Sequence, residues 1–418
     1  KVQSSKFKVQ SSKFKVQSLK SEIPMLAAVS RFVLPPLVVV AALLAYRLTI
    51  AVAGSESAGQ RRTEPLLVAP RYDEPRVITD EQLAAVLDRV KPPTGPPTTN
   101  NLIHALRLWG AKADFQDAAI PTGREMQAYF LDDRVFRRFA GERALPIFYR
   151  DPTGISARSY DEGPADRETS SHHADDLLAT LAEVGTPLDA SLHLRDGRAN
   201  VAELLDSSLG RLHLARFEYE WAMIAYARYV FPQTSFRNRW GERIDVEQLI
   251  DEAIGPPLAL GPCNGLHRLE ALAVLYRADE RAQVLGPRTK RKMLAHMQRV
   301  SDLLVQSQTV SGYWTRHWPQ GAAAANQHGG DRYDQILVTG HQLEWLALAP
   351  EEVQPPRENI VRAGQWLTHA LLEMDRRELL AAYGPYTHAA RGLALWRNQQ
   401  PYEAWLTSRP TQVSLNHP

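Results

Sequence analysis

Two histidine–glutamate pairs are the clearest candidates for chemistry in the sequence. Glu270 follows His267 by three residues, and Glu344 follows His341 by the same interval. Residues three apart lie on one face of a helix, so each glutamate could orient its imidazole, raise its pKa and form a general acid–base pair with it. We therefore take these four residues as candidate catalytic residues. A structural alternative stays open, in which the glutamate stabilises a helix N-terminus and the histidine fills a polar gap.

The pattern recurs at two further histidines. His104 and His388 each lie early in an apolar segment and precede a charged residue, Arg107 or Arg391, by three positions. The free N–H groups and the positive end of a helix N-terminus favour polar and anionic ligands. We therefore expect His104 and His388 to be ligand-binding residues.

Metal and cofactor sites are not indicated. The two His-x-x-Glu pairs would supply four ligands only if their helices faced each other, so we expect no metal. The single cysteine, Cys263, precedes the His267 segment. A helix N-terminus could lower its thiol pKa, but we expect an inert buried residue. The sequence contains no glycine-rich phosphate loop, nucleophile elbow or His-Glu-x-x-His motif, and the cofactor is left unknown.

An aromatic loop over residues 312–319 is a second candidate for ligand binding. Aromatic faces stack on sugar rings or apolar ligands, and arginine binds carboxylates. We expect Trp314 to pack between helices, whereas for the other residues ligand binding and a solvated loop both stay open. The candidate ligand-binding residues here and in the following turn are Arg316, His317, Trp318, Tyr333 and Asp334.

The elements that position these residues are predicted to be helices. Apolar residues recur at helical spacing, and proline or glycine separates most of the segments, as at Gly255-Pro256-Pro257 and Pro355-Pro356. Thr79-Asp80-Glu81-Gln82 has the form of a capping box at a helix start. Strand signals are nearly absent, so we predict an all-α chain. The predicted helices lie at 199–230, 245–254, 264–283, 288–308, 339–349, 357–374 and 386–398.

Two motifs in these helices resemble known α-helical families. Leu304-x-x-x-Gln308-x-x-x-Gly312-x-Trp314 is similar to the QW-type repeats of the terpenoid cyclase and protein prenyltransferase superfamily. His341-Gln342-Leu343-Glu344-Trp345 after Gly340 is similar to a segment of the N-acylglucosamine 2-epimerase family, an (α/α)6 barrel. Both resemblances imply an α/α toroid of helical hairpins over about residues 101–412, with inner and outer helices alternating.

The sequence departs from the catalytic motifs of those families. The Asp-x-Asp-Asp motif of polyene-protonating cyclases is absent, because Asp132-Asp133 and Asp175-Asp176 are isolated pairs. Cys263 lacks the setting of the prenyltransferase zinc cysteine, and no Asp-Asp-x-x-Asp diphosphate motif occurs. Terpene and prenyl chemistry are therefore disfavoured.

The N-terminal part has a different character from the rest. Residues 1–24 repeat the basic heptad KVQSSKF, which indicates a possibly non-native leader. Residues 25–54 contain an apolar run, 33–53, long enough for one transmembrane helix, with a cleaved signal segment as the alternative. Residues 55–100 are predicted to be a proline-rich linker with a short helix, and residues 151–171 to be a flexible insertion. A membrane anchor would place the bulk of the chain outside the cytoplasm, in the periplasm if the source is bacterial.

The composition limits the function classes. The chain has 418 residues, 44% hydrophobic and 23% charged, which excludes a disordered, collagenous or multispan membrane protein. One cysteine excludes a disulfide framework. The net charge is +2, but residues 1–24 contain six lysines and one glutamate, so the remainder is mildly acidic. No basic, aromatic-rich patch indicates a nucleic-acid partner.

Three functions are compatible with this sequence. The first is a cell-envelope protein that binds a glycan, a lipid-like molecule or another small ligand in a toroid cavity. The second is a cavity enzyme of epimerase, lyase or cyclase type that uses the His/Glu pairs, and the third is a structural scaffold. Convergence of the histidines and glutamates on one site would favour the enzyme.

Overall fold

The computed structural model describes residues 61–94, 98–152, 154–160, 166, 168–216, 218–327 and 330–408. These residues belong to one structural unit, Ala53–Pro418. The repeats at 1–24 and the apolar segment at 25–54 lie outside the described residues, so the predictions of a leader and of an anchor are untested. Among the residues described, no helix has the length and apolar character needed to cross a membrane.

The described chain is mostly helical, as predicted. Helix α2 starts at the predicted capping box, where Thr79 and Gln82 cap each other, and most of the other predicted helices form within a few residues of their expected limits. The helices are α2 (Asp80–Arg89), α3 (Thr99–Trp109), α4 (Gly123–Leu131), α5 (Asp133–Ala140), α6 (Asp176–Glu183), α7 (Val201–Arg211), α8 (Glu220–Tyr229), α9 (Val246–Ile254), α10 (Leu266–Ala282), α11 (Pro287–Ser307), α12 (Ala322–Ala325), α13 (Arg332–Leu348), α14 (Arg357–Glu373), α15 (Arg376–Ala381), α16 (Tyr383–Leu395) and α17 (Pro401–Thr407), with short 3₁₀ turns η2 (Pro262–Gly265), η3 (Trp318–Gln320) and η4 (Glu351–Val353).

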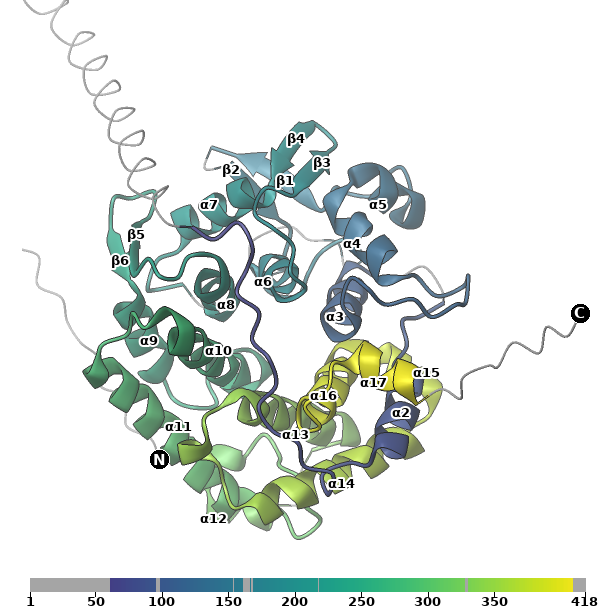
Figure 1. Cartoon of the computed structure of the whole chain (residues 1–418), viewed down its shortest axis with the longest axis vertical. Helices are drawn as coiled ribbons and strands as arrows, with labels where there is room; N and C mark the ends of the chain where they lie inside the picture. Colours follow the sequence, from purple (N-terminus) through teal and green to yellow (C-terminus); the bar gives the residue numbers. More distant parts are fainter. Residues whose placement is uncertain are drawn as a thin grey trace, which may run out of the picture. The chain divides into compact units, whose positions relative to one another are not determined.

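Six helices form a closed circuit of contacts, which we call the central ring. In chain order α3, α6, α8, α10, α13 and α16 each contact the next, and α16 contacts α3 (Figure 1). Other helices pack outside this ring: α7 on α6 and α8, α9 and α11 on α10, and α14 on α13. A central helix is surrounded by protein, so it is buried on every side. Accordingly, all residues of α13 from Ile336 to Leu348 are buried.

The structure differs from the sequence prediction in its short strands and in one helix. The segment 199–230 forms two helices, α7 and α8, because the chain turns between them from the outside of the ring to its inside. Part of the predicted flexible insertion is a strand, β2. Three antiparallel hairpins occur, and their strands are too short for an alternating pattern to be recognised. They are β1 (Phe148–Asp151) with β2 (Gly154–Ala157), β3 (Ser191–Leu194) with β4 (Gly197–Asn200), and β5 (Ser235–Arg237) with β6 (Arg243–Asp245).

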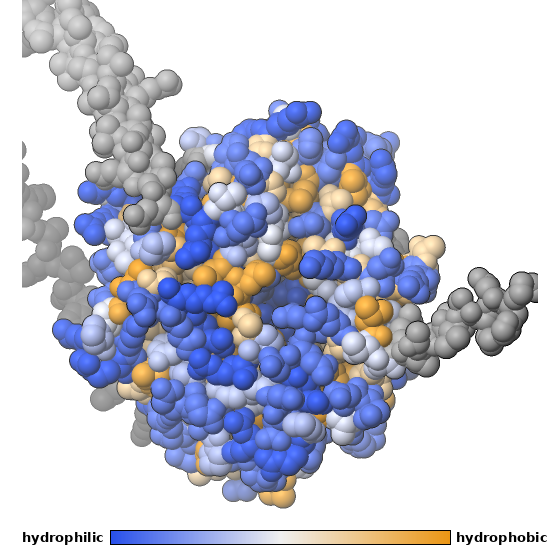
Figure 2. Space-filling model, viewed as in Figure 1, coloured by the Kyte–Doolittle hydropathy of each residue, from blue (hydrophilic) through white to orange (hydrophobic). Residues whose placement is uncertain are grey.

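A segment predicted to be a linker crosses one face of the central ring. Residues 62–78, drawn in purple in Figure 1, run over the C-terminal ends of α8, α10, α13 and α16. Leu66 N–H donates to Arg228 O, and the buried Tyr72 hydroxyl donates to Ala349 O at 2.6 Å. Figure 2 shows this face as largely hydrophilic, with an apolar strip beside a hollow near its middle. The segment is therefore part of the folded unit.

Candidate active site at the centre of the ring

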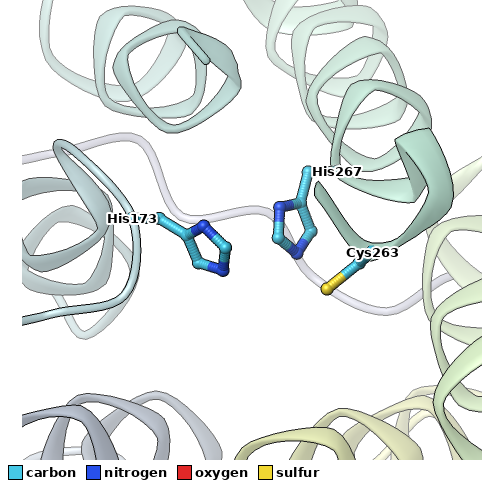
Figure 3. A group of neighbouring side chains, drawn as sticks. All are labelled: His173, Cys263 and His267. Atoms are coloured by element: carbon cyan, nitrogen blue, oxygen red, sulfur yellow. The ribbon is translucent and has the colours of Figure 1, made fainter. Parts of the chain in front are cut away.

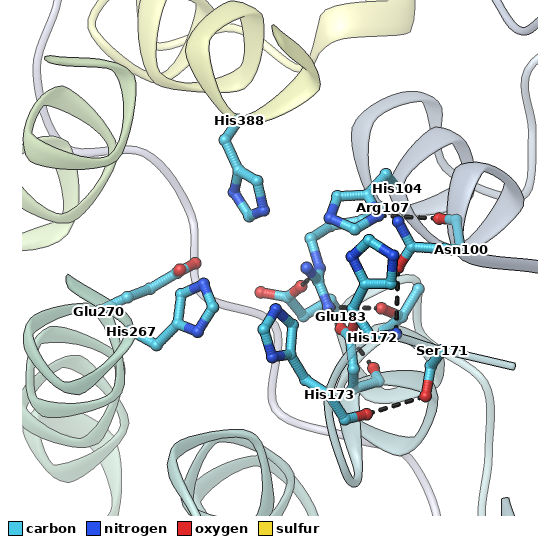
Figure 4. Close-up of polar contacts among 12 residues, drawn as sticks. Asn100, His104, Arg107, Ser171, His172, His173, Glu183, His267, Glu270 and His388 are labelled. Atoms are coloured by element: carbon cyan, nitrogen blue, oxygen red, sulfur yellow. Dashed lines mark hydrogen bonds and ion pairs between the residues drawn. The ribbon is translucent and has the colours of Figure 1, made fainter. Parts of the chain in front are cut away.

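Five histidines meet inside the central ring. His104, His267, His341 and His388 come from α3, α10, α13 and α16, and His173 comes from the turn before α6. Figure 4 shows four of them, His104, His173, His267 and His388. The rings of His341 and His388 stack with their centroids 4.2 Å apart, and the ring centroid of His104 lies 5.2 Å from that of His388. His267 lies 4.8 Å from His173 and 5.5 Å from His341. Side chains from distant parts of the sequence thus form one continuous imidazole cluster.

The partners of the predicted histidines differ from those expected. His388 Nδ1 lies 2.7 Å from a carboxylate oxygen of Glu344, the residue predicted to pair with His341. His341 Nδ1 instead donates to Leu337 O at 2.8 Å, one turn back on its own helix. The reason is geometric, because neighbouring ring helices point their side chains toward a common centre.

His267 also pairs outside its own helix. Its Nδ1 lies 3.3 Å from Glu218, and His173 Nδ1 lies 3.0 Å from the same carboxylate. His267 is in the first turn of α10, whereas His341 and His388 lie near the middle of α13 and α16. His104 likewise lies in the middle of α3, so the predicted role of a helix N-terminus does not apply to His104, His341 or His388.

One arginine holds the predicted glutamates in place. Arg391 Nη1 bonds Glu344 and lies 3.1 Å from Glu270, while its Nη2 lies 3.2 Å from Glu183. Burial and the charge of Glu270 outweigh Arg391 and raise the pKa of Glu344 to about 7. Burial and the adjacent histidines His341 and His104 hold the pKa of His388 well below its ordinary value. Near neutral pH, Glu344 can therefore hold or release a proton, while the adjacent His388 stays neutral.

A second set of buried ion pairs lies beside this cluster. Arg107 bonds Asp176 and Glu183, and Arg228 bonds Glu183 at 3.2 Å. Burial alone would raise the pKa of Glu183, but the three arginines around it lower that pKa to about 2. These groups are almost completely buried. Their charges are satisfied mainly by one another, so we assign them a positioning role.

Cys263 faces three of the histidines. It lies in η2, directly before α10, and is only partly buried. Figure 3 shows its sulfur pointing toward the side of His267 that carries Nε2, with His173 opposite. Burial opposes ionisation, but His267 and His341 outweigh it and hold the pKa of the Cys263 thiol well below its usual range. The pKa of His173 is raised to about 9, because Cys263 and Glu218 outweigh its burial.

Solvent reaches the cluster from the Cys263 end. Cys263 and His173 are partly exposed, and the adjacent Tyr333 is 41% exposed. Burial and the nearby Cys263 raise the pKa of Tyr333. The opposite end of the ring is crossed by residues 62–78. A ligand would therefore meet Cys263, His173 and Tyr333 before it met Glu344.

The predicted ligand-binding residues of the aromatic loop separate into two groups. Tyr333 lies at the mouth of the cluster, but Trp318 is fully buried and packs in η3 against α11. Arg316 is exposed and pairs with Asp334 at 3.0 Å, at the start of α13. His317 contacts Gln320 at 3.5 Å within the same loop. These four residues support the loop and the helix start rather than the cluster.

Sequence reasoning missed His173, Glu218 and Arg391. His173 lies just beyond the flexible insertion predicted at 151–171, and no role was predicted for it, although His172-His173 precedes Asp175-Asp176 and an apolar helix. Arg391 had a usable signal, since it follows His388 at the same interval that separates His267 from Glu270. Glu218 had none, because its two histidine partners are 45 and 49 residues away in the chain.

Comparisons with protein-family models, with curated proteins and with solved structures give no match. The assignment of function below therefore rests on the geometry and chemistry of the central cluster.

Proposed function

We propose that this protein is an enzyme whose active site is the histidine cluster inside the central ring. The observation that carries the proposal is the convergence of five imidazoles, one thiol and three carboxylates, with His173 and Cys263 partly exposed at one end. Groups of this kind with perturbed pKa values, gathered in one site, are typical of acid–base catalysis. The reaction class is proton transfer to and from a bound substrate.

The energetics of burial support a catalytic role over a purely structural one. Buried polar and charged groups reduce stability unless all are paired, and well-packed apolar residues would serve a scaffold at least as well. His341 illustrates the point, since it is 3% exposed and its Nε2 has no hydrogen-bond partner. A structural histidine would have both nitrogens satisfied. An unpaired nitrogen that faces the cluster is suited to accept a proton from a substrate.

The proposed fold is an α/α toroid, with the central ring as its inner helices. The closed circuit of six helices and the helices packed outside it support this assignment. The cluster itself consists of hydrogen-bond donors and acceptors, and the indole of Trp221 packs 4.8 Å from the ring of His267, as an aromatic face beside a sugar would. Small, hydroxyl-rich molecules of the carbohydrate class are therefore the substrates to test first.

Each residue has a specific role in this proposal. His341 is the general base, and the His388–Glu344 pair supplies and removes the second proton. Arg391 positions Glu344, and Glu218 positions His173 and His267. Tyr333 lies where it can contact the substrate at the mouth.

The test is turnover of a panel of sugars, amino sugars and uronic acids, measured by proton exchange with deuterated water and by product analysis. Wild type is compared with His341→Leu and with the control His369→Leu, which changes an exposed histidine on α14. Because His341 bonds only its own helix backbone, His341→Leu is expected to fold. Turnover is expected to fall by roughly 100-fold or more, as for removal of a general base.

Two results would contradict the proposal. One is equal turnover by His341→Leu and wild type. The other is saturable binding of a panel member with neither turnover nor isotope exchange, which would indicate a ligand-binding protein.

A further inference from the structure

The mouth of the cluster contains a set of side chains suited to a metal ion. His173, Cys263 and His267 each offer one ligand atom, and these three atoms all lie within 4.8 Å of one another. In a tetrahedral zinc site, ligand atoms are about 3.3–3.6 Å apart. Small side-chain movements would therefore bring all three atoms into the coordination sphere of one ion. Figure 3 shows the three side chains converging from two separate parts of the chain.

The hydrogen bonds that hold these two histidines are of the kind found around metal-binding histidines. The carboxylate of Glu218 accepts from His173 Nδ1 at 3.0 Å and from His267 Nδ1 at 3.3 Å. With both Nδ1 atoms engaged, the Nε2 atoms carry the lone pairs that a metal needs. One carboxylate thus orients two histidine ligands. The negative charges of Glu218 and of a Cys263 thiolate would balance a divalent cation.

The backbone around Cys263 is shaped to present its sulfur. Cys263 and Asn264 have φ values of 47° and 57°, in the left-handed region, and Gly265 follows with φ 72°. A Cβ at Gly265 would lie 2.1 Å from Leu258 O, so only glycine fits there. Strained residues of this kind persist where the surrounding structure imposes them, often at functional sites.

A fourth group lies next to this set. His341 Nδ1 donates to Leu337 O, which leaves Nε2 as a buried lone pair without a hydrogen-bond partner. The centre of its ring lies 5.5 Å from the centre of the His267 ring, so it is next to one of the three candidate ligands. Three protein ligands beside an open position that faces a base are characteristic of catalytic zinc sites.

A second carboxylate and histidine group in the ring is less suited to a cation. Glu270, Glu344 and His388 also lie within 4.8 Å of one another. However, the guanidinium of Arg391 already bonds both glutamates and supplies the positive charge there. The group at Cys263 instead includes a soft thiol ligand, which zinc binds well.

We propose that His173, Cys263 and His267 bind a zinc ion, with Glu218 orienting both histidines and with the fourth position open beside His341. One thiolate and two imidazoles match the ligand preference of zinc. The proposal deepens the proposed function, because it places a Lewis acid in the same site. Metal binding can be measured without a substrate, so the two proposals can fail separately.

The test is titration of the chelator-treated full chain with zinc alone. Calorimetry measures the affinity, and metal analysis measures the number of zinc ions bound per chain. Wild type is expected to bind one equivalent with a Kd below roughly 1 µM. Cys263→Ser and His173→Asn are expected to weaken binding by roughly 100-fold or more, and Glu218→Gln by about 10–100-fold. The control is His369→Asn, an exposed histidine, which should bind as wild type does. Cobalt substitution should give a thiolate-to-cobalt absorption band that Cys263→Ser lacks.

Circular dichroism and thermal unfolding of each variant separate loss of the site from loss of the fold. Absence of stoichiometric binding by natively folded wild type would overturn the metal site. Equal binding by wild type and a natively folded Cys263→Ser or His173→Asn would also overturn it. If zinc binds but no substrate is turned over, the proposed function alone fails. If turnover occurs and zinc does not bind, the metal site alone fails.

Discussion

The residues of the cluster are held by two different kinds of interaction. Glu218, Arg391 and Glu183 each bond two or more charged partners, so their loss would leave buried charges unpaired. His341 bonds only a backbone carbonyl of its own helix. The first kind of residue is needed for the fold as well as for the site, whereas the second can be removed with little effect on the fold. Variants of the two kinds should therefore separate stability from activity.

Glu183 tests the charge network through the pH dependence of stability. Its pKa is lowered from 4.5 to about 2, so its contribution to stability is present above about pH 4.5 and is lost as pH falls toward 2. Glu183→Gln should lower the free energy of unfolding at pH 7 by roughly 3–5 kcal/mol, because buried arginines lose their partner. The difference from wild type should begin to narrow as pH falls below about 5 and continue to narrow toward pH 2, because the carboxylate of the unfolded chain takes up a proton near 4.5 and that of the folded chain only near 2.

Denaturant unfolding between pH 7 and pH 4 measures this difference. Glu403→Gln, an exposed glutamate on α17, is the control and should change stability by less than about 0.5 kcal/mol at every pH. A Glu183→Gln difference that is independent of pH would contradict the role given to the network.

At the scale of elements, the close approach of α13 and α16 brings His341 and His388 into a stack. Two glycines make this approach possible. A Cβ at Gly340 would lie 2.8 Å from Ala389 Cα, and a Cβ at Gly392 would lie 3.2 Å from the backbone N of Glu344. The glycines are thus required by the packing of the two helices that carry the proposed acid–base residues His341, Glu344 and His388.

Gly340→Ala should push α13 away from α16. We expect a loss of about 1–3 kcal/mol in the free energy of unfolding, together with lower turnover, because the inserted methyl group meets backbone rather than a flexible side chain. Gly210→Ala is the matched control, since Gly210 lies in helix α7 with no atom within 4 Å of an added Cβ. It should be neutral or slightly stabilising. Equal thermal and denaturant stability of the two variants would show that the helix contact is looser than described.

At the scale of the whole molecule, the sequence predicts where the helices lie in the chain better than it predicts which segments pack against them. The helical spacing of apolar residues, and the capping, proline and glycine residues at the ends of segments, located five helices closely, because these signals are local. The helices are α2, α9, α10, α11 and α14. The same signals could not show that 62–78 packs on the ring, since its contacts are with residues more than a hundred positions away.

The sequence likewise predicted some residues of the candidate site but not the contacts between them. The sequence indicated His104, His267, His341 and His388, and the structure brings all four together. The carboxylate partners of His267 and His388 could not be predicted, because Glu218 and Glu344 come from other parts of the ring. Cys263 was expected to be inert, yet it lies at the mouth, since its exposure depends on the turn that precedes α10.

A reactive cluster open to solvent and a sealed polar core differ in the reactivity of Cys263. The most direct measurement is the rate at which iodoacetamide alkylates Cys263 in the folded, chelator-treated chain, followed by mass spectrometry. Because Cys263 is the single cysteine, the adduct is unambiguous. The account predicts complete alkylation at pH 7 without unfolding, at least as fast as that of a cysteine peptide. A thiol that reacts only after denaturation would contradict it.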